Sequence, residues 1–170
     1  MVLVGAVLVA VSFAFMGHTA ADERRWLLAA LLILHLLLVA FWSGALWPLL
    51  ISVKRESLAV AGLVIEAFSS LAVWLVPIIF FAGLGLAVAL VPDLASLRAP
   101  YGLLLLSKVA GFALLMGLAG LNKGRLGPRI ARGEAGALPV FRRVVVAEWL
   151  LLVAVVAVTA TMTDLFSPAH

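Results

Sequence analysis

Long apolar runs separated by short polar links dominate this sequence. A helix crosses the roughly 30 Å hydrocarbon core of a bilayer with about 20 apolar residues. Five apolar segments lie along the chain, at residues 2–16, 26–52, 68–91, 101–122 and 144–163. Only 12% of the 170 residues are charged, which is too few to cover a soluble protein of this size. We predict one all-α domain, an integral membrane bundle of about five transmembrane helices surrounded by lipid.

Two stretches allow alternatives to simple spans. Residues 2–16 are short for a span, at roughly 23 Å, and resemble a signal-peptide core. Because no Lys or Arg precedes them, we favour a retained helix. Lys54, Arg55 and Glu56 interrupt the next apolar run. We predict a short interfacial helix over residues 56–66 before the third span, the alternative being one continuous helix that projects beyond the membrane.

The basic residues predict an orientation in the membrane. Most of them lie in the links 54–67 and 123–143, and only Arg24, Arg25 and Arg98 lie on the other side. The positive-inside rule then places the N-terminus in the cytoplasm and the C-terminus outside. The basic residues form short clusters rather than one continuous face, so we expect no nucleic-acid partner.

Ionisable residues inside apolar spans are costly in lipid, so they indicate function. His35 and Lys108 lie roughly 13 and 10 Å below the external surface if each span is a regular helix, and we predict that they share a polar pocket that opens outward. Two simpler roles stay open: His35 hydrogen-bonds a neighbouring helix, and Lys108 extends to the interface. Glu66 lies at the edge of a span.

Three further residues are singled out by their position. Trp42 follows His35 by seven residues and shares its helix face, so we expect it to pack inside the bundle. Glu148 lies near the level of Asn122 at the cytoplasmic side, and we predict that it pairs with Asn122 or with a neighbouring Arg. A proton relay through Glu148 is the alternative. Gly83 and Gly85 lie inside an apolar helix, which indicates helix packing rather than phosphate binding.

Soft metal ligands gather at the external side. Met16 and His18 follow the first apolar run, Met162 ends the last one, and His170 ends the chain. Thioether and imidazole together suit Cu(I), although Met is also a common apolar filler. The chain has no Cys, which excludes thiolate sites. It contains no hydrolase or nucleotide-binding motif, so we predict that it is not an enzyme.

Short motifs give the chain a resemblance to a known family. Gly17-His18 and the run from His35 through Trp42 and Gly44 resemble the copper resistance protein D (CopD) family. The second half matches more extensively. Its matching stretches are Tyr101-Gly102 leading to Lys108, Leu121-Asn122-Lys123, Phe141-Arg142-Arg143, Glu148 and Val158-Thr159. The resemblance covers roughly residues 16–163.

The resemblance implies copper handling, by import or tolerance, in the inner membrane of bacteria. The positions it indicates are His18, His35, Trp42, Lys108, Asn122 and Glu148. From the chemistry of their side chains we predict metal ligands at Met16, His18, His35 and Met162, with Met16 and His18 capturing the ion at the external side and His35 receiving it in the bundle. Longer family members carry further helices and a periplasmic copper-binding partner domain, so a periplasmic copper-binding protein is an expected partner.

Two other functions stay open at this stage. One is electron transfer through b-type haem, whose iron takes axial His or Met. With three histidines, of which only His35 lies well inside a span, at most one haem fits. The other is a non-catalytic subunit of an oligomer or larger membrane complex, since small residues on helix faces allow close packing.

Overall fold

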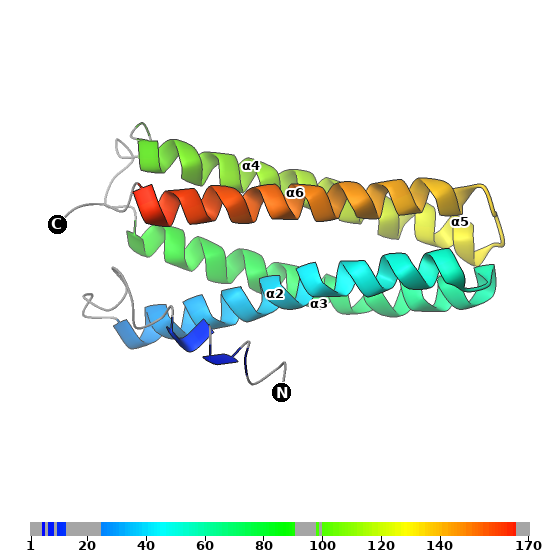
Figure 1. Ribbon diagram of the computed structural model, residues 1–170, viewed down its shortest axis with the longest axis horizontal. Coiled ribbons are helices and arrows are strands. Elements are labelled where there is room, and N and C mark those ends of the chain that lie inside the picture. Colours follow the sequence, from blue (N-terminus) through cyan, green and yellow to red (C-terminus); the bar gives the residue numbers. More distant parts are fainter. Residues whose placement is uncertain are drawn as a thin grey trace. The chain divides into compact units, whose positions relative to one another are not determined.

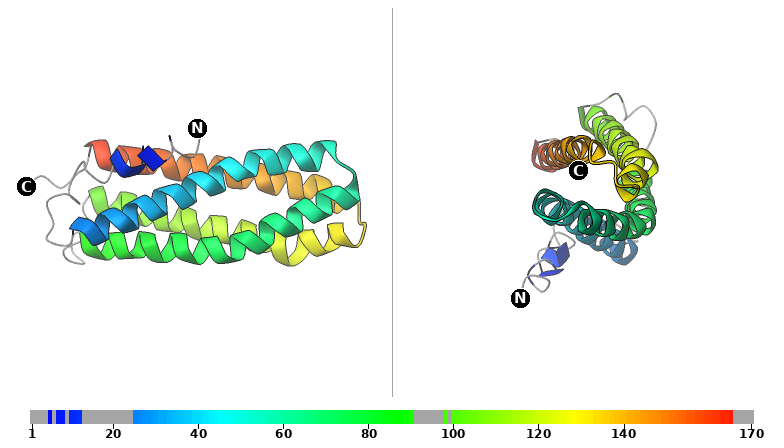
Figure 2. Two further views of the ribbon diagram at one scale, coloured as in Figure 1. Left: turned by 90° about the horizontal axis from the view of Figure 1, so that it is seen from below. Right: turned by 90° about the vertical axis from the view of Figure 1, so that its right-hand side faces the viewer.

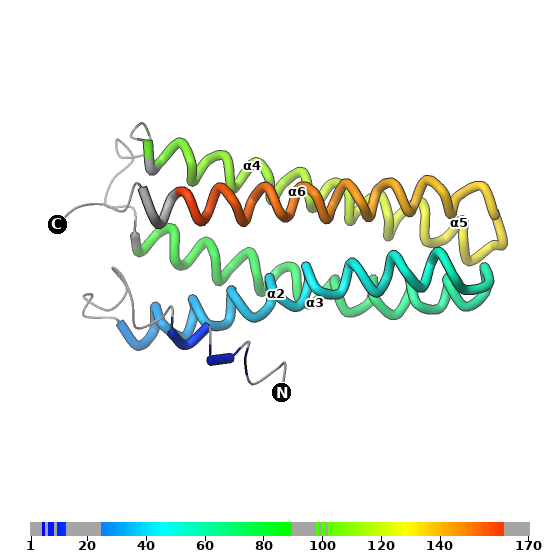
Figure 3. Tube along the Cα trace, viewed as in Figure 1, coloured from blue at the N-terminus to red at the C-terminus, as the bar shows by residue number. Residues whose placement is uncertain are grey.

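The structure, a computed structural model, describes residues 5, 7–8, 10–12, 25–90, 98 and 100–165 (Figures 1 and 3). For residues 90, 101 and 162–165 it describes the backbone alone. The elements from residue 25 onward, in chain order, are α2 (Arg25–Arg55), α3 (Leu58–Leu90), α4 (Pro100–Leu121), the π-helix η3 (Asn122–Leu126), α5 (Gly127–Ala131) and α6 (Ala137–Leu165). The described part of the chain contains no strand.

Four helical stretches are long and apolar enough to cross a membrane. They are Arg25–Arg55, Leu58–Ala89, Gly102–Ala131 and Ala137–Thr161. Their large apolar side chains are widely exposed, as at Leu63, Trp74 and Val88, each more than 70% exposed. Such a surface suits lipid rather than water. The chain is therefore a multi-pass, all-α membrane bundle, as predicted, while the predicted span 2–16 lies largely outside the described residues.

The predicted interfacial helix over residues 56–66 is wrong as a separate element. Ser57 caps α3, because its hydroxyl accepts a hydrogen bond from the Val60 N–H at 3.4 Å. From Leu58 the helix continues without a break for 33 residues, since no helix-breaking residue separates Glu66 from the apolar run that follows. A helix of this length measures roughly 50 Å. It exceeds the hydrocarbon core, so part of α3 extends beyond it.

Two helices continue beyond the predicted spans at their polar ends. Helix α2 continues through Lys54 and Arg55, and α6 begins at Ala137 rather than at residue 144. Basic residues are good helix formers and are favourable at a helix C-terminus, where they oppose the helix dipole. Pro139 lies in the first turn of α6, where the backbone N–H groups have no intrahelical acceptor, so the proline is tolerated there.

The described helices form two compact units. Unit 1 comprises Met1–Gly44 and Leu71–Pro92, and unit 2 comprises Ala45–Ser70 and Asp93–His170. Helices α2 and α3 contribute residues to both units. In unit 2, α4 and α6 lie side by side (Figures 1 and 2). A Cβ at Gly111 would lie 2.5 Å from Val155 Cγ2, so the missing side chain permits this close approach of the two helices.

The core of unit 2 is a regular stripe on α6 that meets the end of α4. The buried α6 residues are spaced three or four apart, which puts them on one helix face; they are Ala137, Phe141, Val145, Glu148 and Leu152. Leu126 of η3 and Ile130 of α5 are also buried. From α3, Ile65 approaches Gly127, and Gly62 approaches Ile130. One carboxyl group therefore lies within an otherwise apolar stripe.

Candidate functional site

The predicted metal ligands are only partly within the described residues. Met16 and His18 lie outside them, and of Met162 only the backbone is described. His35 is described, in α2. Among the described residues, no group of three or more His, Asp or Glu side chains is placed to hold a metal ion. The four-residue ligand set therefore stays a prediction, and His35 is the member whose surroundings are known.

His35 is bound to the backbone of α3 within unit 1. Its Nδ1 lies 3.0 Å from the Ile79 carbonyl oxygen. Because a carbonyl only accepts, Nδ1 carries the hydrogen and donates it. In the neutral ring the lone pair then resides on Nε2. The hydrogen bond to a neighbouring helix that the sequence allowed for His35 is confirmed.

The His35 ring lies against Gly83, one turn beyond Ile79 on α3. A Cβ added at Gly83 would be 3.0 Å from His35 Cε1 and 3.3 Å from Nδ1. Gly85 is similarly close to a side chain of α2, with 3.3 Å from its Cβ position to Leu31 Cδ1. The two glycines thus provide helix packing, as predicted, and Gly83 also makes room for the imidazole ring.

Trp42 is a packing residue of α2. Its side chain is 5% exposed, which confirms the predicted position inside the protein. His35 is half-buried and lies seven residues earlier on the same helix. A buried indole on this face helps to fix which side of α2 points inward, and so where the imidazole lies.

Glu148 and Asn122 form a buried polar pair in unit 2. The Asn122 Nδ2 donates a hydrogen bond of 2.8 Å to Glu148 Oε1. The two residues are 7% and 2% exposed, respectively. The predicted pairing is therefore confirmed. The Asn122 Oδ1 is also buried and has no hydrogen-bond partner among the described residues.

A change in helix type positions Asn122. It begins the π-helix η3, and the Gly127 N–H donates to the Asn122 carbonyl oxygen, five residues back. A Cβ at Gly127 would lie 3.2 Å from that oxygen. A π-helical turn inserted into an α-helix rotates the residues around it relative to a regular helix, and such turns are frequent at functional sites. This local geometry sets how the Asn122 amide approaches α6.

Arg142 has a role that the sequence analysis missed. Its Nη2 donates a 2.6 Å hydrogen bond to the Val53 carbonyl oxygen in the last turn of α2. The last four carbonyls of a helix lack intrahelical donors, and a positive charge there opposes the helix dipole. The sequence indicates an orientation role for the basic residues of this link, but no contact of Arg142 with α2. The Arg-Arg motif of the family resemblance was the one sequence signal that singled it out.

Lys108 and Glu66 show no comparable contacts. Lys108 is half-buried in α4, and Glu66 is exposed on α3. Within the part of the chain that the structure describes, neither forms a hydrogen bond or an ion pair through its side chain. Lys108 belongs to unit 2 and His35 to unit 1. The outward-opening pocket predicted for these two residues stays a prediction.

The link between α5 and α6 is organised by a small charged cluster. Glu134 forms salt bridges with Arg129 at 2.7 Å and with Arg132 at 2.9 Å. The hydrogen bonds from Arg129 and then Arg132 lower the pKa of the Glu134 carboxyl below its ordinary value. Gly133, with a φ of 83°, supplies the left-handed residue that the turn requires. The cluster joins Glu134 to both arginines of the turn.

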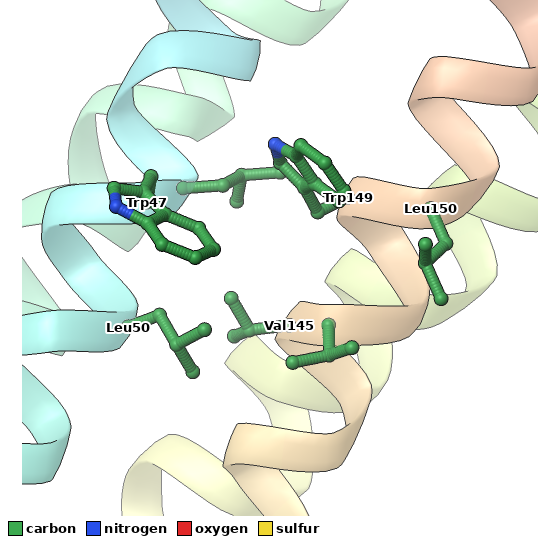
Figure 4. Close-up of a pocket in the computed structure, with 7 residues that line it drawn as sticks. Trp47, Leu50, Val145, Trp149 and Leu150 are labelled. Carbon is green, nitrogen blue, oxygen red and sulfur yellow. The ribbon is translucent and has the colours of Figure 1, made fainter.

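An apolar groove lies between the parts of α2 and α6 that belong to unit 2. Its volume is about 130 Å³. Trp47 and Trp149 stand across it with ring centroids 6.1 Å apart, above Leu50 and Val145 (Figure 4). The groove is lined by Leu46, Trp47, Leu50, Val145, Val146, Trp149 and Leu150. None of these offers a metal ligand or an ionisable group, so this groove is not the copper site predicted from the sequence.

A comparison with protein-family models matches residues 62–162 to copper resistance protein D (CopD). The matched region is more than half of the chain. It contains Lys108, Asn122, Arg142 and Glu148, and it leaves out His35. No curated protein and no solved structure matches the chain.

Proposed function

This chain belongs to the copper resistance protein D family of membrane proteins, and from that membership we propose that it binds copper from the external side of a bacterial inner membrane. The ion is cargo, in import or in tolerance. The observation that carries the proposal is the family match over residues 62–162, combined with a membrane-embedded imidazole in α2. A periplasmic copper-binding protein is the proposed donor.

The orientation of His35 supports a role as the receiving ligand. A histidine that binds a metal almost always donates its other ring N–H to a carbonyl or carboxylate, which fixes the ring and its tautomer. The Nδ1 of His35 makes such a bond to the Ile79 carbonyl oxygen. Nε2 is then the nitrogen that would bind copper. Because only the neutral ring binds, copper affinity is expected to fall as the pH is lowered.

Capture at the external mouth is assigned to the ligands predicted from the sequence. Met16, His18 and Met162 would offer two thioethers and one imidazole, a donor set that suits Cu(I). His35 would accept the ion from them. Lys108 would adjust the charge along the path of the ion. The hydrogen bond from Arg142 to the Val53 carbonyl oxygen would stabilise the end of unit 2 where α2 ends.

Metal analysis of the purified full chain tests the ligand assignment. We expect copper to be bound by the wild type and lost in His18→Ala together with His35→Ala, because both imidazoles are removed. Trp74→Phe, which changes an indole that is 75% exposed, is the matched control. Unchanged copper content in the double variant would overturn the assignment. A visible spectrum with a Soret band would favour haem instead.

The proposed orientation has its own test, made simple because the chain has no Cys. Arg98→Cys and Ala135→Cys each place one thiol at an exposed position. In intact cells a membrane-impermeant maleimide should label the first variant and not the second. Labelling of the second alone would reverse the orientation, and with it the side from which copper arrives.

A further inference from the structure

Glu148 lies near the middle of the apolar span of α6, and among the described residues its carboxyl has no ion-pair partner. It is 11 residues from Ala137 and 13 from Thr161, the ends of the apolar span of α6. Its side chain is 2% exposed and shares its helix face with Val145 and Leu152. A carboxylate so placed needs a cation or an extra proton, because lipid and apolar side chains do not solvate its charge.

No basic side chain among the described residues forms an ion pair with Glu148. Several lie on the elements that pack against α6 or on α6 itself: Lys54, Arg55, Lys108, Lys123, Arg125, Arg129, Arg142 and Arg143. Arg142 is directed to the Val53 carbonyl oxygen, and Arg129 to Glu134. Glu66 of α3 is exposed. The group that contacts the Glu148 carboxyl directly is the neutral amide of Asn122.

The Asn122 amide is satisfied at one end only. Its Nδ2 donates to Glu148 Oε1 at 2.8 Å, while its Oδ1 is buried without a donor. An unpaired buried acceptor costs free energy comparable to a lost hydrogen bond. A protonated carboxyl has an O–H donor as well as an acceptor oxygen. An amide and a carboxylic acid can therefore pair through two reciprocal hydrogen bonds, which a carboxylate cannot do.

We propose that Glu148 and Asn122 form a proton-binding site inside unit 2, in which one exchangeable proton on the Glu148 carboxyl is stabilised by the Asn122 amide. The π-helical turn that starts at Asn122 presents the amide to α6, and the apolar stripe around Glu148 keeps other cations from the carboxyl. The site is separate from the proposed copper ligands. It gives the chain a titratable group inside a membrane-spanning helix.

Infrared difference spectroscopy of the full chain between mildly acidic and mildly alkaline buffers tests the site. We expect a protonated-carboxyl C=O band that shifts in heavy water. Glu148→Gln, which keeps the shape, should abolish the band, and Asn122→Leu should shift it because the amide hydrogen bond is lost. Glu66→Gln removes an exposed carboxyl and should leave the band unchanged.

The other outcomes are equally informative. If the wild type has no such band, or if Glu148→Gln leaves it intact, the proposal is wrong. A carboxylate band that responds to sodium rather than to pH would show that a metal ion occupies the site, which also overturns it. Circular dichroism of each variant checks that the helices persist. Copper content should not change in Glu148→Gln, so failure here is distinguishable from failure of the proposed copper ligands.

Discussion

Units 1 and 2 each accommodate a polar side chain in a membrane-spanning helix, but in different ways. In unit 1 the half-buried His35 ring donates to a backbone carbonyl, and Gly83 makes room for it. In unit 2 the Glu148 carboxyl, 2% exposed, is bound by one side-chain amide. Every helix residue has a carbonyl oxygen, so the hydrogen bond of His35 requires only that the ring fits beside α3, which Gly83 permits. The arrangement in unit 2 depends on the chemistry of a single residue, Asn122.

The largest expected effect tests the dependence of unit 2 on side-chain chemistry. Asn122→Leu leaves the buried carboxyl without its donor, and we expect the free energy of unfolding to fall by about 2–3 kcal/mol. Replacing both members, Asn122→Leu with Glu148→Leu, removes the unsatisfied group and should recover most of that loss. Reversible unfolding in mixed detergent micelles measures the four corners of this cycle. Additive effects of the two substitutions would contradict an energetically coupled pair.

The second effect tests the dependence of unit 1 on shape. In Gly83→Ala the new Cβ would lie 3.0 Å from His35 Cε1, so the ring must shift by a few tenths of an ångström, and we expect its hydrogen bond to the Ile79 carbonyl oxygen to weaken or break. Loss of an orienting hydrogen bond typically lowers metal affinity by roughly tenfold to a hundredfold. Copper titration of the purified chain measures this change. Gly44→Ala in α2 is the control, because its Cβ would have nothing within 4 Å.

A smaller effect is expected where a charged side chain of unit 2 binds backbone. Arg142→Ala removes the donor to the Val53 carbonyl oxygen, and we expect a loss of about 1–2 kcal/mol in unfolding free energy. Arg142→Lys should recover part of it, since one ammonium can still donate. Arg143→Ala, at the exposed neighbouring position, should change little. Equal losses at both arginines would indicate a general charge effect instead of a specific cap.

The contrast between side-chain and backbone contacts also explains what the sequence could predict. Apolar run length indicated four of the helices, and the depth of Glu148 and Asn122 in their spans brought this pair together. The partners of His35 and Arg142 are carbonyl oxygens of Ile79 and Val53, 44 and 89 residues away. Every residue has a carbonyl oxygen, so residue types do not indicate which oxygen accepts the hydrogen bond.

The point at which α3 begins could not be predicted from residue types either. The charged group at residues 54–56 suggested an interfacial helix after it, but the hydroxyl of Ser57 caps α3 and the chain continues to Leu90. The π-helical turn at Asn122 also has no composition signal, because it is a change of hydrogen-bond register by one residue. The pairing of Asn122 with Glu148 was thus easier to predict than the way in which each helix begins or changes.

The smallest expected effect lies outside the spans, where the same kind of carboxyl meets water. The bonds from Arg129 and Arg132 lower the pKa of Glu134, so the ionised form is favoured in the folded chain. Its contribution to stability is therefore present above the pKa of the unfolded chain and is lost as the pH falls through the lower, folded value. Because this cluster is at the surface and screened by salt, the shift in Tm on acidification should be slight and should vanish in Glu134→Gln. A large acid-induced drop that survives this substitution would have to come from another titratable group, a carboxyl or a histidine. The buried Glu148 is not that group if its proton is already bound, so the two carboxyls are expected to respond to acid in different ways.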